Sequence, residues 1–254
     1  MSKGTVYLVG AGPGNPNLLT LEAARLLKEA EVVVYDNLVS SEIIKLIPVT
    51  AEKIFVGKQS KNHTVPQNEI NSMLVKKSLE GKRVVRLKGG DPFLFGRGGE
   101  EAQELRKNRI KFVVVPGVTS ALSAPAYAGI PVTHRMFSSS LAIVTGHEDP
   151  NKAEKRIQWS KLATSVDTIV ILMGVENLAG IAAQLIKGGR DPKTEVAIIE
   201  NGTTKDQKVT KGTLENISFI SVEQNVKSPA VIVIGEVVGL REELNWFGGQ
   251  SHIP

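Results

Sequence analysis

The chain contains no cysteine among its 254 residues. Disulfides, thiolate nucleophiles and cysteine-based zinc sites are therefore excluded. It also lacks an apolar run of membrane-spanning length, and its first residues lead into a strand without a basic segment followed by an apolar one. From these absences we expect a cytoplasmic protein that does not bind a membrane.

Aromatic residues are scarce, at 5% of the chain, and no dense basic block is interleaved with them. This disfavours binding of single-stranded nucleic acid, which depends on stacking of bases against aromatic rings. The formal net charge of +5 comes from lysines and arginines that are scattered along the chain. That distribution favours a small anionic metabolite as the partner.

The hydrophobic pattern of residues 1–116 alternates short apolar runs with segments of helical spacing. Such alternation predicts an α/β domain with a mainly parallel sheet. Thr20 is placed as the N-cap of the first helix, and Gly81 closes the helix that begins near Pro66. The expected strands are 5–9, 31–35, 53–56, 83–87 and 112–115, and the expected helices are 18–29, 41–47, 66–80 and 100–107.

The second half has another pattern, because several expected strands follow one another without a helix between them. It predicts a mixed α+β domain. We expect the first domain over 1–116, the second over 117–247 and a flexible tail over 248–254. The expected elements of the second half are strands over 140–145, 168–173, 195–200, 207–212 and 230–235, and helices over 120–127 and 177–187.

A glycine-rich turn, Val-Gly-Ala-Gly-Pro-Gly at 9–14, directly follows the first apolar strand. A dinucleotide-binding fold would need Gly-x-Gly-x-x-Gly here and an acid after the second strand, where Asp36 stands. However, Asn15 occupies the position of the third glycine, and Pro13 and Pro16 lack the N–H groups that bind a diphosphate. The sequence therefore provides too few backbone N–H donors for a good phosphate site.

A second glycine turn, Gly-Gly-Asp-Pro, follows another buried strand. Gly89 and Gly90 allow a ligand to approach the backbone, and Pro92 holds Asp91 extended. The Asp91 carboxylate suits a cation or ribose hydroxyls, or it caps the next helix, and the local sequence leaves both interpretations open. Two such turns at strand ends predict one shared small-molecule site.

Longer motifs run in order along nearly the whole chain, from the first glycine turn to Leu-Asn-Trp-Phe at 244–247. Between them stand Val-Val-Tyr-Asp-Asn-Leu-Val-Ser at 33–40, Phe-Val-Gly-Lys at 55–58, Arg-Leu-Lys-Gly-Gly-Asp-Pro-Phe-Leu-Phe-Gly-Arg-Gly-Gly-Glu-Glu at 86–101, Val-Pro-Gly-Val-Thr-Ser-Ala at 115–121, Gly-Ile-Pro-Val-Thr-His-Arg at 129–135, Val-Thr-Gly-His at 144–147, Met-Gly at 173–174, Glu-Asn-Gly-Thr at 200–203 and Ser-Pro-Ala at 228–230. On these motifs the chain resembles the uroporphyrinogen-III C-methyltransferases of the tetrapyrrole methylase family.

The resemblance implies a two-domain enzyme and homodimer that binds S-adenosylmethionine between its domains and releases S-adenosylhomocysteine. It implies two methylations of uroporphyrinogen III, at C-2 and C-7, giving precorrin-2 through precorrin-1 for sirohaem or cobalamin synthesis. Asp36 and Lys58 are the implied proton acceptor and donor. The implied cofactor contacts are Pro13, Gly89, Gly90, Asp91, Leu94, Thr119, Ser120, Met173, Gly202 and Ala230.

The residues themselves support part of this chemistry. Asp36 stands at the carboxyl end of an expected strand, where it could accept the ring proton lost after methyl transfer or could only form the turn ahead of Asn37. Lys58, Arg97 and Arg135 are the cations expected to bind substrate carboxylates, the alternative being solvated surface charge. No metal site is expected, because the four histidines are far apart in the sequence.

Other activities are compatible with the sequence. A methyltransferase of the same fold could act on a later corrin precursor, on diphthine or on ribosomal RNA. An NAD-dependent dehydrogenase or a tetrapyrrole carrier without turnover would be a different class of protein. The Tyr-Asp-Asn-Leu-Val-Ser and Phe-Val-Gly-Lys segments favour uroporphyrinogen.

Overall fold

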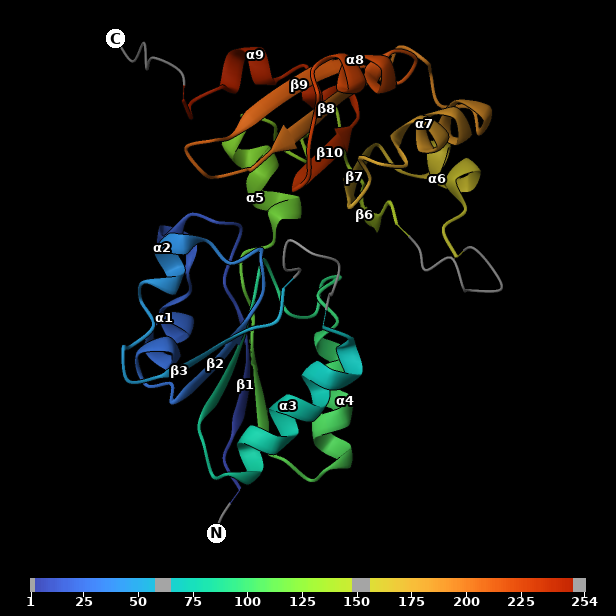
Figure 1. The fold of residues 1–254 in the computed structure, drawn as a ribbon. Helices are drawn as coiled ribbons and strands as arrows, with labels where there is room; N and C mark the ends of the chain where they lie inside the picture. The colour runs from blue at the N-terminus through green and yellow to red at the C-terminus, as the bar shows by residue number, and fades with distance from the viewer. Residues whose placement is uncertain (1–2, 58–64, 148–155, 249–254) are drawn as a thin grey trace. The chain divides into compact units, whose positions relative to one another are not determined.

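The computed structural model describes residues 3–57, 65–147 and 156–248. The chain forms two compact units, Met1–Thr119 and Ser120–Pro254, and each has its own sheet. Figure 1 labels most of the helices and strands of both units. None of the helices in the described ranges has the length and apolar character needed to span a bilayer.

The first unit contains a five-stranded sheet in the order β3-β2-β4-β1-β5, and every pairing in it is parallel. The predicted parallel sheet is confirmed. Its strands are β1 (Val6–Gly10), β2 (Val32–Tyr35), β3 (Glu52–Phe55), β4 (Val84–Lys88) and β5 (Phe112–Val115). Its helices are η1 (Pro16–Leu18, a 3-10 helix), α1 (Leu21–Lys28), α2 (Ser41–Ile44), α3 (Gln67–Leu79) and α4 (Gly98–Lys107).

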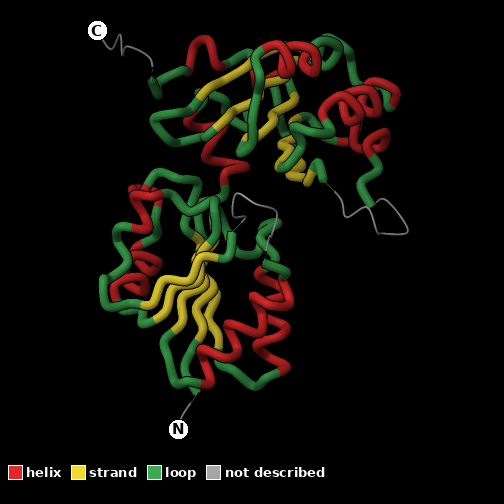
Figure 2. Tube along the Cα trace, viewed as in Figure 1, coloured by secondary structure: helices red, strands yellow, loops and turns green. Residues whose placement is uncertain are grey.

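Helices cover both faces of this sheet, with α1 and α2 on one face and α3 and α4 on the other (Figure 2). Strands buried on both faces need continuous apolar runs, which Val32, Val33 and Val34 supply in β2. The predicted N-cap of α1 is confirmed, because Thr20 Oγ1 accepts the Ala23 amide at 3.1 Å.

The second unit contains a mixed sheet in the order β6-β7-β10-β8-β9. β6 and β7 pair in parallel and the other described pairs are antiparallel, so the predicted mixed domain is confirmed. Its strands are β6 (Leu141–Thr145), β7 (Thr168–Leu172), β8 (Glu195–Glu200), β9 (Lys208–Thr213) and β10 (Ala230–Ile234). Its helices are α5 (Ser120–Tyr127), α6 (Trp159–Ser165), α7 (Leu178–Lys187), α8 (Ile217–Glu223), η2 (Glu236–Val238, a 3-10 helix) and α9 (Arg241–Leu244).

The sequence pattern missed α6 and α8, which separate strands that were expected to follow one another directly. Each helix has seven residues, too few to be stable without tertiary packing. Trp159 and Ala163 of α6 and Ile217 of α8 are buried in one apolar core with β7, β8 and β10. Burial therefore stabilises helices that local periodicity does not reveal.

Candidate functional site

The two glycine turns of the first unit are bonded to each other. The Gly12 amide donates to the Gly90 carbonyl at 3.1 Å, and the Gly90 amide donates to the Gly12 carbonyl at 2.7 Å. Gly12 has φ +73° and Gly90 has φ +66°, conformations that glycine adopts without steric strain. The loops after β1 and β4 therefore form one backbone structure at the carboxyl edge of the sheet.

A third loop, after β5, joins them through Gly117. A Cβ atom added at Gly117 would lie 2.2 Å from the Gly90 carbonyl oxygen and 2.7 Å from the Gly10 Cα. Side chains do not tolerate such distances, so the three backbones can meet only because these residues are glycines. Sequence reasoning did not assign Gly117 to the site, although a glycine just after an apolar strand is the same signal as in the other two loops.

Asp91 fixes two of these loops relative to each other. Its Oδ1 accepts the amides of Phe93 at 2.8 Å and Leu94 at 3.0 Å, and its Oδ2 accepts the Gly117 amide at 3.0 Å. The interpretation of Asp91 as the cap of the next helix is wrong, because Arg97 is the N-cap residue of α4. The carboxylate instead sets the shape of the loop that follows β4.

Two amides of the first glycine turn donate to β4 and the loop that follows it. The Ala11 amide donates to the Lys88 carbonyl at 2.7 Å, the Gly12 amide donates to Gly90, and Pro13 has none. Asn15 is the N-cap of η1, where its side chain accepts the Asn17 amide at 3.0 Å. A diphosphate would need those amides as donors. The geometry therefore suits a ligand that approaches glycine backbone but carries no diphosphate.

Four charged side chains meet beside this edge, between β4, α4 and the loop after β2. Arg86, Lys88 and Glu101 are 3%, 4% and 0% exposed. Glu101 Oε1 accepts Arg86 Nε at 3.0 Å and Lys88 Nζ at 2.8 Å. Arg86 Nη2 donates to Asp36 Oδ2 at 3.1 Å. Burial, followed by the charge of Arg86, lowers the pKa of Lys88, and Glu101 acts in the opposite direction.

Sequence reasoning placed Asp36 but missed its three charged neighbours. The available signal was the order Val-Val-Arg-Leu-Lys in β4, because alternate residues of a strand share a face and buried charges need partners. Asp36 follows β2 as expected, and its Oδ1 also accepts the Leu38 amide at 3.1 Å. Asp36 therefore does form the predicted turn, while its other oxygen binds Arg86.

The described part of the structure does not bring together the three cations that we expect to bind the substrate. Lys58 lies outside them. Arg97 is exposed, has φ +60°, and forms a two-point pair with Glu100, with N–O distances of 3.0 and 2.6 Å. Arg135 is exposed in the second unit, within a turn closed by the His134–Ser138 bridge.

In the second unit, three of the expected cofactor residues lie at one end of neighbouring strands. β7 pairs with β10 so that Leu172 faces Val231, and β8 pairs with β10 so that Glu200 faces Ala230. The residues just beyond these pairs include Met173 and Gly202. The sheet register therefore brings Met173, Gly202 and Ala230 to the same edge.

Met173 and Gly202 also have unusual backbone surroundings. Met173 is 51% exposed and has φ +55°, a conformation that costs energy for a residue with a Cβ and is enriched at ligand sites. A Cβ at Gly202 would lie 2.4 Å from the Cβ of Ala124 in α5. Ser120 begins that helix, and Thr119 ends the first unit.

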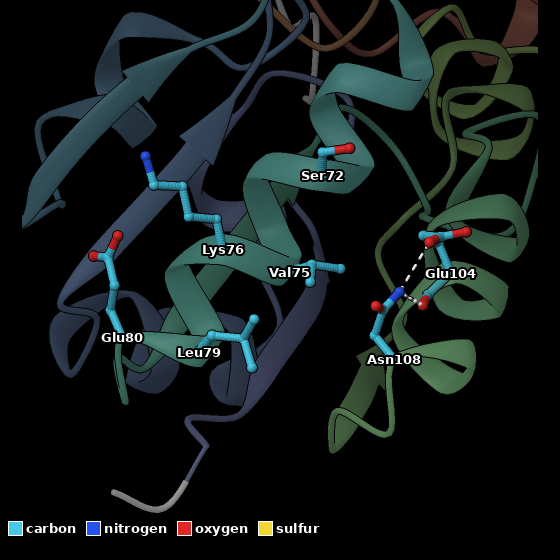
Figure 3. Close-up of a pocket in the computed structure, with 7 residues that line it drawn as sticks. All are labelled: Ser72, Val75, Lys76, Leu79, Glu80, Glu104 and Asn108. Carbon is cyan, nitrogen blue, oxygen red and sulfur yellow. Dashed lines mark hydrogen bonds between the residues drawn. The ribbon is translucent and has the colours of Figure 1, made fainter.

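A groove of about 430 Å³ lies between α3 and α4 of the first unit (Figure 3). Asn108 Nδ2 closes part of it by donating to the backbone carbonyl and to Oε1 of Glu104, both at 2.8 Å. Its lining residues are Ser72, Val75, Lys76, Leu79, Glu80, Glu104 and Asn108. None of them belongs to the glycine loops or the buried charged group, so this groove is not the candidate site.

A family comparison covers most of the chain, including both glycine loops. Residues 5–218 match the model of the Tetrapyrrole (Corrin/Porphyrin) Methylases. The chain belongs to the tetrapyrrole methylases. This tetrapyrrole methylase is 56% identical over 241 residues to the S-adenosyl-L-methionine-dependent uroporphyrinogen III methyltransferase of Methanosarcina barkeri, covering 95% of this chain and 94% of that one.

A second relative of this tetrapyrrole methylase is the siroheme synthase of Pseudoalteromonas atlantica, at 51% identity over 249 residues. The alignment covers 98% of this chain and 54% of that protein, so the chain spans about half the length of that relative.

Solved structures agree on the fold. The uroporphyrin-III C-methyl transferase of Thermus thermophilus, complexed with S-adenyl homocysteine, has a TM-score of 0.79 and 42% identity, covering 92% of this chain and 93% of that one. A cobalt precorrin-4 methyltransferase has a TM-score of 0.81 and 27% identity, covering 92% and 95%. The fold class predicted from the sequence is confirmed.

Proposed function

We propose that this tetrapyrrole methylase transfers methyl groups from S-adenosylmethionine to C-2 and C-7 of uroporphyrinogen III, giving precorrin-2 through precorrin-1. The observation that carries the proposal is the bonded pair of glycine loops, which suits a nucleoside ligand without a diphosphate. It occurs in a chain 56% identical to an S-adenosyl-L-methionine-dependent uroporphyrinogen III methyltransferase. A dinucleotide-dependent dehydrogenase is disfavoured by the same loops, because the amides of Ala11, Gly12 and Gly90 donate within the protein and Pro13 has none.

The proposed cofactor residues fall into one group in each unit. In the first unit the bonded glycine backbones and the Asp91 hydrogen bonds support a rigid binding surface. In the second, the left-handed Met173 presents a half-exposed thioether, which packs well against a flat adenine ring. The residues are Pro13, Gly89, Gly90, Asp91, Leu94 and Thr119, together with Ser120, Met173, Gly202 and Ala230.

S-adenosylmethionine supplies an electrophilic methyl group on a sulfonium, and the nucleophile is a ring carbon of the tetrapyrrole. Asp36 accepts the proton that the methylated ring loses, and its two oxygens are oriented by Arg86 and by the Leu38 amide. Lys58 donates a proton or binds a substrate carboxylate, and the exposed Arg97 and Arg135 bind substrate carboxylates. Alignment of the two reactants supplies much of the rate.

The same proposal includes a cytoplasmic homodimer that binds neither nucleic acid nor membranes and supplies sirohaem or cobalamin synthesis. Scattered rather than clustered lysines and arginines support the absence of a nucleic-acid partner. The proposed domain boundary at residue 116 lies three residues before Thr119, where the first compact unit ends.

The proposal is tested by incubating the purified protein with S-adenosylmethionine carrying a ¹³C-methyl group and with uroporphyrinogen III. Mass spectrometry should show two added methyl groups, and NMR should place them at C-2 and C-7. No transfer to uroporphyrinogen III, together with transfer to a later corrin precursor, would show that the alternative methyltransferase is correct. Binding of uroporphyrinogen III without any transfer would indicate a carrier.

A further inference from the structure

The carboxylate of Glu101 is completely buried, and its contacts fall on one oxygen. Oε1 accepts Arg86 Nε at 3.0 Å, Lys88 Nζ at 2.8 Å and Gln67 Nε2 at 3.2 Å. Oε2 is buried and has no hydrogen-bond partner among the residues that the structure describes. A buried charge is costly even when it is paired, so its presence calls for a reason other than stability.

Helix packing does not supply that reason. α4 already packs on the sheet through Ala102 and Leu105, which are buried in the core formed with β1, β2 and α3. A buried ion pair is often no better for stability than apolar residues of the same volume. Glu101 is therefore not needed to attach α4 to the sheet.

Arg86 connects Glu101 to Asp36 directly. Its guanidinium donates through Nε to Glu101 and through Nη2 to Asp36, while Nη1 donates to the Leu87 carbonyl at 3.0 Å. Nε and Nη2 belong to one planar and rigid guanidinium, so a displacement of Nε also moves or rotates Nη2. The position of Glu101 thus determines where Arg86 holds the Asp36 carboxylate.

We propose that Glu101 is a positioning residue for methyl transfer, which acts through Arg86, with Lys88 as its second ligand, to fix the Asp36 carboxylate in place. The inference rests on the proposed function, in which Asp36 accepts the ring proton.

The charges around Lys88 support this role. Lys88 is faced by Arg86 from its own strand, by Glu101 and Glu100 from α4, and by Asp36 from the loop after β2. Glu101 is the acid that contacts both buried cations from within the core, and together with Asp36 it balances their two charges. When the charge of Glu101 is removed, the repulsion between Arg86 and Lys88 is no longer offset at this point. Arg86 then moves away from its observed position.

The test is Glu101→Gln, which keeps the shape of the side chain and removes its charge. We expect kcat for uroporphyrinogen III to fall by about tenfold or more, since the proton acceptor is displaced. KM and the Kd of S-adenosylhomocysteine should stay within about twofold, because neither ligand is proposed to contact Glu101. The pH profile of kcat should shift, and Glu101→Asp should restore part of the rate.

Glu104→Gln is the matched control, since Glu104 lies one turn further along α4 and contacts Asn108 and Lys107 instead. It should keep the rate of the unchanged protein. The double variant Asp36→Asn with Glu101→Gln should be no slower than Asp36→Asn alone, because both changes disable the same group.

Circular dichroism and thermal unfolding establish whether each variant is folded. If Glu101→Gln does not fold, the double variant Lys88→Met with Glu101→Gln replaces it, because this variant removes one cation together with the acid. The double variant should fold. Its kcat should be low, because Arg86 Nε still lacks its carboxylate partner. If the unchanged protein is active and the folded Glu101 variant has a normal kcat, the inference is overturned and the proposed function is retained. An unchanged protein that does not methylate uroporphyrinogen III would overturn the proposed function itself.

Discussion

Gly12 and Gly90 exchange two backbone hydrogen bonds, so the loops after β1 and β4 are held together by main chain alone. Gly10 and Gly117 pack against the same carbonyl of Gly90, at distances that leave no room for a Cβ atom. The binding surface that we propose for S-adenosylmethionine is therefore backbone, and its shape depends on glycine at each of these positions.

Gly117→Ala should disturb this surface. The added methyl group would lie 2.2 Å from the Gly90 carbonyl oxygen, so one loop must move. We expect a loss of about 1–3 kcal/mol in the free energy of unfolding, the usual cost of overpacking, and a weaker Kd for S-adenosylhomocysteine. Thermal unfolding and isothermal titration calorimetry measure the two effects.

The control for that variant is Gly99→Ala in α4, where an added Cβ would meet no described atom within 4 Å. Alanine favours a helix over glycine by about 0.5–1 kcal/mol, so this variant should be slightly more stable and bind S-adenosylhomocysteine normally. Equal binding by both alanine variants would contradict the proposed surface.

Asp91→Ala should also weaken binding of S-adenosylhomocysteine. It leaves the amides of Phe93, Leu94 and Gly117 without their acceptor, at a cost of about 1–3 kcal/mol in the free energy of unfolding. The protein should still fold, because its core does not include Asp91. An unchanged Kd by calorimetry would remove Asp91 from the cofactor site.

Asp36→Asn should separate chemistry from binding. The amide cannot accept the ring proton, so kcat should fall by about a hundredfold or more. Calorimetry should find the Kd of S-adenosylhomocysteine little changed, because Asp36 is proposed to act on the substrate. A variant with normal turnover would show that Asp36 is only a turn residue.

Met173→Gly should affect stability and binding in opposite directions. Glycine removes the steric cost of φ +55°, so the Tm should be unchanged or higher, whereas loss of the thioether should weaken S-adenosylhomocysteine binding. Asn225→Gly, at φ +51° after α8, is the control and should leave binding unaltered. Weaker binding in both variants would point to a general change in the second unit instead.

Asp167→Asn should destabilise the second unit in a pH-dependent way. The Ser140 hydroxyl and then the Ser139 amide, which precede β6, donate to Asp167 and lower its pKa. A lowered carboxyl pKa stabilises the folded state above the ordinary value of about 3.9, and this contribution is lost as the pH falls through the folded-state pKa. The difference in Tm between the two proteins should therefore be largest near neutral pH and shrink in acid.

The secondary structure around the site could be predicted from local sequence. The side-chain contacts of the site could not be predicted in this way. Thr20 capped α1 as expected, because a cap and its partner amide lie within one turn of the chain. Asp91 and Gly117 are 26 residues apart, and Arg86 and Glu101 are 15 apart. Their pairing depends on which strands are neighbours in the sheet, which hydrophobic periodicity does not specify.

The nature of the ligand could be predicted in part. Pro13 and Pro16 already indicated too few amide donors for a diphosphate. Only the structure shows that the Ala11 and Gly12 amides also donate within the protein, to the carbonyls of Lys88 and Gly90. The sequence therefore disfavoured a dinucleotide, and the hydrogen bonds give the physical reason.

Calorimetric titration of the unchanged protein with S-adenosylhomocysteine and, separately, with NAD measures most directly what the glycine loops bind. We predict saturable binding of S-adenosylhomocysteine that Gly117→Ala weakens, and no binding of NAD. Saturable binding of NAD, with none of S-adenosylhomocysteine, would contradict the assignment of these loops to a methyl donor.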